Sequence, residues 1–122
     1  MKLKKYNRRN VLGRLSAYPT LAVSKSGIIR VNSRAMVCFG LTVGSKINIV
    51  NDQESPRDWY VELTDEPDGL VLRKSNSALA CNSATIAFEM KNIIKDATTV
   101  VMRIATEPVP GYPRMYALLN NA

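Results

Sequence analysis

Residues 25–50 read KSGIIRVNSRAMVCFGLTVGSKINIV, and their pattern predicts a turn, a strand, a short helix and a second strand. The helix is marked at both ends, because Asn32-Ser33 supplies an N-cap for Arg34 to Phe39 and Gly40 ends it as a C-cap. Strands are expected on either side, at Ile28 to Val31 and Lys46 to Val50. The stretch therefore predicts a fold in which strands dominate and helices are short.

The flanking sequence adds further strands. Thr20 to Ser24 precedes the Lys25-Ser26-Gly27 turn and is expected to be a strand. Asp58 to Leu63 and Leu70 to Arg73 are expected to pair as a hairpin around the turn at 65–69. The segment from Asn51 to Arg57 is interpreted as a polar loop.

The second half repeats the order of the first. A strand at Ala78 to Cys81, a cap at Asn82-Ser83 and a helix from Ala84 to Ile94 precede strands at Thr98 to Thr106 and Arg114 to Leu119. The apolar stripe of this helix is expected at Ile86, Phe88, Met90, Ile93 and Ile94. Two β-helix-β-β units, at about 20–74 and 78–119, suggest an internal pseudo-two-fold. Coincidence is the alternative, since Asn-Ser caps are common.

Charge is distributed unevenly along the 122 residues. The chain has 17 Lys and Arg against 10 Asp and Glu, and the first 50 residues hold ten basic side chains and no acid. Residues 51–122 hold 7 basic and 10 acidic side chains, with most of the acids at 52–68. A basic end of this kind suits a polyanion, although a solvated tail or a contact to an acidic protein is the alternative. A basic arm is expected at 1–16, with the cations Lys2, Lys4, Lys5, Arg8, Arg9 and Arg14.

The composition argues against catalysis, metal binding and a membrane span. There is no His, the two Cys are 43 positions apart, and no glycine-rich phosphate loop is present, so no enzyme activity and no cofactor are expected. No apolar run approaches the roughly 20 residues of a membrane helix, which predicts a cytoplasmic protein. Cys38 and Cys81 are expected to be reduced core residues, although Cys81 precedes a helix N-terminus, a position that lowers a thiol pKa.

Four segments carry a resemblance to a known family. They read KSGIIRV at 25–31, FGLTVGSK at 39–46, INIV at 47–50 and GLVLRK at 69–74. Over about 50 residues, from Val23 to Lys74, the chain resembles the AbrB-type swapped-hairpin family, which includes MazE-like antitoxins. That family usually has a proline just before its helix, where this chain has Asn32.

The resemblance implies a DNA-binding β-sheet module built from two swapped copies. Carried over by position, it places Lys25, Arg30 and Arg34 on double-stranded DNA. Lys and Arg are also the side chains that contact phosphates and guanine edges. The expected fold is mainly β (α+β): a small swapped-hairpin or pseudo-two-fold β-barrel at 17–122, with two short helices and the basic arm. The expected function is that of an AbrB-like transcriptional regulator or antitoxin-like repressor.

A second function class stays open. A noncatalytic structural or assembly module, of phage or mobile-element type, would use the basic arm to dock on a partner protein or on packaged nucleic acid. A homo-oligomer could then form between the arm of one copy and the acidic 52–68 hairpin of the next. The acids of that hairpin are Asp52, Glu54, Asp58, Glu62, Asp65, Glu66 and Asp68.

Overall fold

The fold, seen in a computed structural model that describes residues 18–90 and 99–119, is dominated by strands, as expected. The basic arm and its six cations lie outside the described residues, as do Ile93 and Ile94 of the expected helical stripe. The elements of the described part are β1 (Thr20–Ser24), β2 (Ile28–Val31), α2 (Ser33–Phe39), β3 (Lys46–Asp52), β4 (Ser55–Thr64), β5 (Leu70–Val71), β6 (Arg73–Ser75), β7 (Ala78–Asn82), α3 (Ala84–Glu89), β8 (Thr99–Ile104) and β9 (Met115–Leu119).

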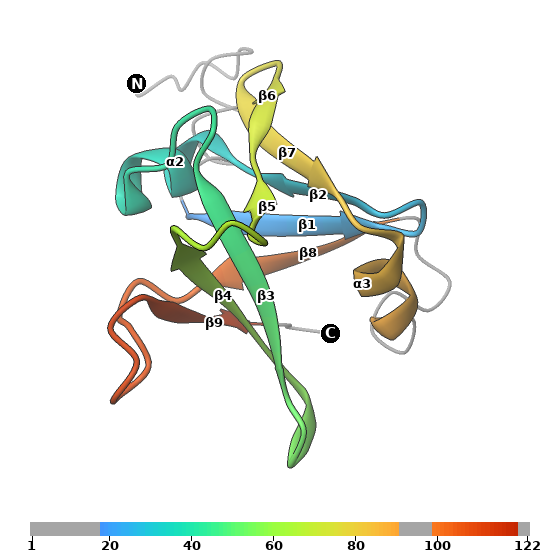
Figure 1. Cartoon of the computed structure of the whole chain (residues 1–122), viewed down its shortest axis with the longest axis vertical. Helices are drawn as coiled ribbons and strands as arrows, with labels where there is room; N and C mark the ends of the chain where they lie inside the picture. Colours follow the sequence, from blue (N-terminus) through green and yellow to red (C-terminus); the bar gives the residue numbers. More distant parts are fainter. Residues whose placement is uncertain (1–17, 91–98, 120–122) are drawn as a thin grey trace, which may run out of the picture.

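The strands form one antiparallel sheet that curls into a nearly closed barrel (Figure 1). Its order is β5-β3-β4-β9-β8-β1-β2-β7-β6. Because β5 and β6 are separated only by Leu72, one short stretch of chain joins the two ends of this order. The barrel shape confirms the coarse expectation of a small, mainly β barrel with two short helices.

The barrel encloses a single hydrophobic core. Side chains alternate along a strand, so every second residue points inward. On β1 and β2 the inward positions are fully buried aliphatic residues, and both halves of the chain contribute to the same cluster. The largest fully buried side chains are Leu21, Ile29, Ile47, Leu72, Leu79, Met90, Met102, Val23 and Val31.

Both helices begin at the residues that the sequence indicates. The Asn32 side chain caps α2 by accepting from the Ala35 N–H at 2.9 Å, and Gly40 ends the helix with a φ of 64°. Ser83 caps α3 in the same way. The expected stripe of α3 is only partly correct, because Met90 is buried but Phe88 is 63% exposed.

The hairpin expected between Asp58–Leu63 and Leu70–Arg73 is wrong. β4 pairs with β3 and β9, whereas β5 pairs with the opposite edge of β3. The segment interpreted as a polar loop holds the β3–β4 turn and the start of β4. Its polar side chains stabilise that turn, since Asn51 Nδ2 donates to the carbonyls of Pro56 and Asp58 at 3.0 and 3.1 Å. Polarity alone therefore did not distinguish a strand-linking turn from a longer loop.

Candidate nucleic-acid interface

The three basic residues carried over from the family lie along β2 and at its two ends. Lys25 is exposed in the β1–β2 turn, Arg30 is exposed on β2, and Arg34 is exposed in the first turn of α2. Since the turn and α2 lie at opposite ends of β2 (Figure 1), the structure does not gather the three side chains into one cluster.

The turn that carries Lys25 is fixed against α3. Gly27 adopts a φ of 97°, and its carbonyl accepts from the Ser83 N–H at 2.7 Å. Ser24 closes the turn from the other side, because its carbonyl accepts from the Gly27 N–H at 3.0 Å and its hydroxyl from the Ile28 N–H at 3.0 Å. Lys25 is therefore presented on a rigid turn.

Asn32 fastens the start of β1 to the start of α2. Besides capping the helix, its Oδ1 accepts from the Thr20 N–H at 3.0 Å, and its Nδ2 donates to the Tyr18 carbonyl at 2.8 Å. The Tyr18 ring packs against Arg103, whose guanidinium carbon lies 3.8 Å from the ring centroid. The chain at Tyr18 and Thr20, which follows the expected arm, is thereby hydrogen-bonded to Asn32 at the start of α2. Arg34 lies in the first turn of the same helix.

Arg30 belongs to a basic surface that the sequence analysis did not identify. On the outside of the barrel Arg30 pairs in register with Ala80 of β7, and Ala80 pairs with Arg73 of β6. Arg30 Nη2 also reaches across β7 to donate to Ser75 Oγ at 3.3 Å. We call this surface, which is formed by β2, β7 and β6, the β6 groove.

The β6 groove has a volume of about 610 Å³. Its lining contains three cations and no acid, and it also includes apolar residues of β5. Two of the cations, Arg73 and Lys74, belong to the last segment that carries the family resemblance, and no binding role was predicted for either of them. The pairings of β7 with β2 and β6 bring them into the same groove as Arg30. The β6–β7 pairing is a local hairpin around Asn76, which has a φ of 55°, and that turn could have been recognised, whereas the β2–β7 pairing has no local sequence signal.

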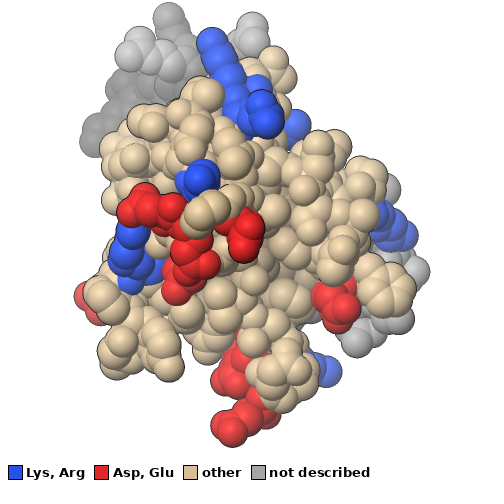
Figure 2. Space-filling model, in the orientation of Figure 1, with Lys and Arg blue, Asp and Glu red and all other residues tan. Residues whose placement is uncertain are grey.

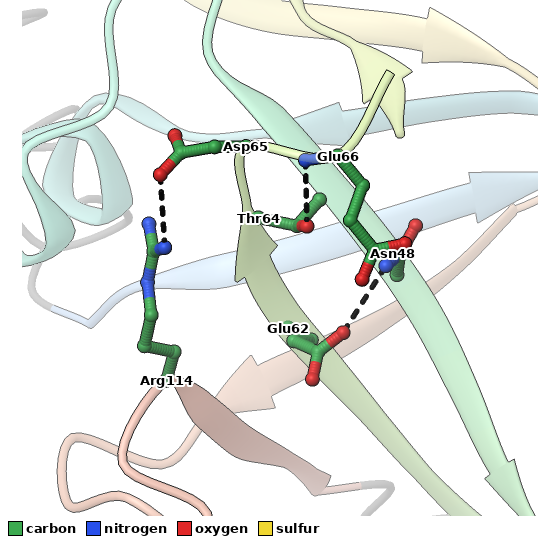
Figure 3. Close-up of polar contacts among 6 residues, drawn as sticks. All are labelled: Asn48, Glu62, Thr64, Asp65, Glu66 and Arg114. Atoms are coloured by element: carbon green, nitrogen blue, oxygen red, sulfur yellow. Dashed lines mark hydrogen bonds and ion pairs between the residues drawn. The ribbon is translucent and has the colours of Figure 1, made fainter. Parts of the chain in front are cut away.

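Acidic side chains gather elsewhere on the barrel. Figure 2 shows them over the end of β4, apart from the basic group over β6. Glu62 accepts from Asn48 Nδ2 at 3.1 Å, and Asp65 forms an exposed ion pair with Arg114 at 3.2 Å (Figure 3). Glu66 and Asp68 of the same connection are exposed. The acidic group and the β6 groove are thus separate on the folded surface, but the groove takes two of its three cations, Arg73 and Lys74, from the acidic part of the sequence.

The two thiols depart from the sequence-based expectation in different ways, Cys38 in its exposure and Cys81 in its pKa. Cys38 is exposed on α2 and is not a core residue, whereas Cys81 is buried as expected. Burial raises the pKa of Cys81 to about 11, so the lowering expected from the nearby helix N-terminus is wrong. In the part of the chain that the structure describes, no group of three or more Cys, Asp or Glu side chains is arranged to hold a metal ion, and no helix is long and apolar enough to cross a membrane.

Comparison with known proteins gives no match. No family model matches the chain, and no curated protein or solved structure matches it either.

Proposed function

We propose that the protein binds double-stranded DNA through one basic side of a pseudo-two-fold β-barrel, as an AbrB-like transcriptional regulator or antitoxin-like repressor. The observation that carries the proposal is the acid-free β6 groove beside β2, on a chain whose first 50 residues also lack acids. Lys and Arg on such a surface neutralise backbone phosphates and release counterions, which favours DNA binding.

The strand pairing supports the pseudo-two-fold. A shift of 50 residues aligns the Asn-Ser caps at 32–33 and 82–83, and it moves Arg30 onto Ala80. Arg30 thus lands on its own register partner, as a two-fold axis through the middle of that pair requires. β4 and β9, the expected counterparts in the two units, also pair with each other.

The same symmetry supports exchange of strands between the units. β1 forms a hairpin with β2 but also pairs with β8 of the other unit. Correspondingly, the chain at 70–75 pairs with β7 through β6 and with β3 of the other unit through β5. In this proposal the second unit begins at Leu70, eight residues before the boundary expected from the sequence.

The proposed contacts divide into two kinds. The six cations of the arm would neutralise phosphates without regard to base sequence, while Lys25, Arg30 and Arg34 would fix the register on the duplex. The second unit lacks equivalent charges, because Ala80 and Ala84 correspond to Arg30 and Arg34 under the shift of 50. The barrel would therefore bind DNA in one preferred orientation, as suits a non-palindromic site.

Fluorescence anisotropy of a labelled random duplex over a salt series tests the proposal. The full chain is compared with a full-length variant in which the six cations of the arm are replaced by Gln. About six phosphate contacts should cost roughly three decades of affinity between 50 and 200 mM salt. The variant should retain weaker binding with a smaller slope. Absence of binding by the unmodified chain at low salt would refute the proposal, and complete loss with the arm charges would leave no role for the barrel.

The acidic surface favours the assembly module as a second candidate. Glu62, Asp65, Glu66 and Asp68 lie on the end of β4 and the connection that follows it, as a folded counterpart for the basic arm of another copy. Sedimentation at low salt without DNA separates the two candidates, since only the assembly module requires self-association through the arm. Self-association that disappears in the Gln variant of the arm would support this second function.

A further inference from the structure

We propose that the β6 groove holds a single backbone phosphate of the duplex between Arg30 and Arg73, above Ala80. This inference rests on the proposed DNA binding and specifies a contact that the family resemblance did not carry over, since Arg73 lies outside the three transferred positions. The pairing of β7 with both β2 and β6 places the two arginines on the same side of the barrel wall.

The spacing of the two arginines suits one phosphate. Register partners on adjacent strands share a face, and adjacent strands are about 4.8 Å apart, so the Cα atoms of Arg30 and Arg73 are separated by about 10 Å. Between them Ala80 provides only a methyl group. The Arg30 side chain leans across β7 towards Ser75 of β6, so its guanidinium and that of Arg73 can converge on one tetrahedral anion above this methyl group.

Both guanidinium groups are available to an anion. Arg30 donates one hydrogen bond to the neutral Ser75 hydroxyl, and a guanidinium has five N–H donors. Within residues 18–90 and 99–119, Arg114 with Asp65 is the ion pair that the structure shows, so no described carboxylate neutralises Arg30 or Arg73. Lys74 adds a third positive charge to the groove lining. A bound anion would relieve the mutual repulsion of these cations.

A phosphodiester fits this surface better than an enclosed small ligand does. The groove is open and lies on the outside of the sheet, where a duplex can lie across several strands. Guanidinium groups bind phosphate oxygens in a bidentate manner, which adds direction to the charge attraction. The row of register partners across the strands reads Ala22, Arg30, Ala80, Arg73. Each arginine therefore has only alanine as a register partner, and no bulky side chain of this row stands between the two cations.

Replacement of Arg73 in the full chain tests the inference. Arg73→Gln keeps the side-chain length but removes the charge, and Arg57→Gln removes an equally exposed arginine near the tip of the β3–β4 hairpin as a control. We expect Arg73→Gln to weaken duplex binding about tenfold and to reduce the salt slope by about 1, whereas Arg57→Gln should change neither. Ala80→Glu, which places an acid between the arginines, should weaken binding at least as much.

Two further measurements distinguish the outcomes. Equal urea midpoints for all variants would show that the loss of binding does not come from unfolding, and Arg30→Gln with Arg73→Gln should lose less than the sum of the single losses. If the unmodified chain binds DNA and Arg73→Gln behaves like Arg57→Gln, this inference is overturned while DNA binding stands. If the unmodified chain binds no duplex, both fail. Binding of adenosine monophosphate that depends on Arg73 without any effect on duplex binding would overturn the duplex assignment in favour of a free nucleotide.

Discussion

Substitution of Gly27 by alanine should destabilise the barrel more than the same change at Gly44. Both glycines have nearly the same φ, 97° and 95°, so an added Cβ meets the same backbone strain. Their surroundings differ. A Cβ on Gly27 would lie 2.9 Å from the backbone nitrogen of Ala84 and 3.0 Å from the carbonyl carbon of Ser83, whereas nothing lies within 4 Å of one on Gly44.

The magnitudes follow from these two contributions. Left-handed backbone costs a residue with a Cβ about 1–2 kcal/mol, which is the whole effect expected for Gly44→Ala. Gly27→Ala adds an overlap with backbone that cannot rotate away, and overpacking of this kind costs typically about 1–3 kcal/mol. The total expected at Gly27 is therefore about 2–5 kcal/mol. Relief of the overlap would move the turn away from α3, so part of this destabilisation comes from loss of the hydrogen bond from the Ser83 N–H to the Gly27 carbonyl.

Urea unfolding of the unmodified chain and the two variants measures the difference. The comparison requires equal m-values, because a changed slope would indicate a different denatured or native state. Equal losses at the two glycines would refute the argument that the β1–β2 turn packs tightly against the start of α3. A larger loss at Gly27 would also support the rigid presentation of Lys25, which precedes it by two residues.

Two core and cap substitutions, one thiol modification and one pH series have specific expected outcomes. Asn32→Ala should cost about 1–3 kcal/mol in urea unfolding, because the Thr20 and Ala35 N–H groups lose their acceptor. Leu79→Ala, at a side chain 1% exposed, should cost about 2–5 kcal/mol. At pH 8 a thiol reagent should modify exposed Cys38 quickly and Cys81 only on unfolding. Because burial raises the pKa of Cys81 from 9.0 to about 11, the folded state retains that proton over this range, and stability should fall as the pH rises through it. Cys81→Ala should lack that part of the decline.

Local signals in the sequence predicted the elements but not all of their partners. The cap at Asn32, the glycine at position 40 and the bounds of β1 depend on neighbouring residues, and the structure confirms them. β4 has one local partner, β3, which a tight turn at 53–54 joins to it, and one distant partner, β9. The sequence offered a plausible turn before Leu70, but β4 instead pairs with β3 and β9. Strand pairing across the barrel is decided by burial of the whole core, which no single segment encodes.

The same limit applies to the candidate site. Arg30 could be selected from the family resemblance, but Arg73 becomes its neighbour only through β7, which lies about 50 residues after Arg30 in sequence. The useful signal was the alternation on both sides of Leu72, which leaves Arg73 outward while Leu72 is buried. Under the proposed two-fold, Arg73 is the counterpart of Ala22 in the first unit, because each pairs with one member of the Arg30–Ala80 pair.

The proposed two-fold gives a physical reason for Ala80. In a symmetric pair of identical units, the position at the axis would place one arginine directly opposite another on adjacent strands, and like charges in that arrangement destabilise a sheet. In the proposed arrangement a single chain carries both units and they can differ in sequence, and Arg30 faces alanine. The second cation stands one strand further away, as Arg73 on β6. This arrangement removes the closest repulsion, keeps two positive charges on the same surface and leaves the space between them open for an anion. In this proposal, fusion of the two units lets one arginine lie at the axis without a second arginine directly opposite it.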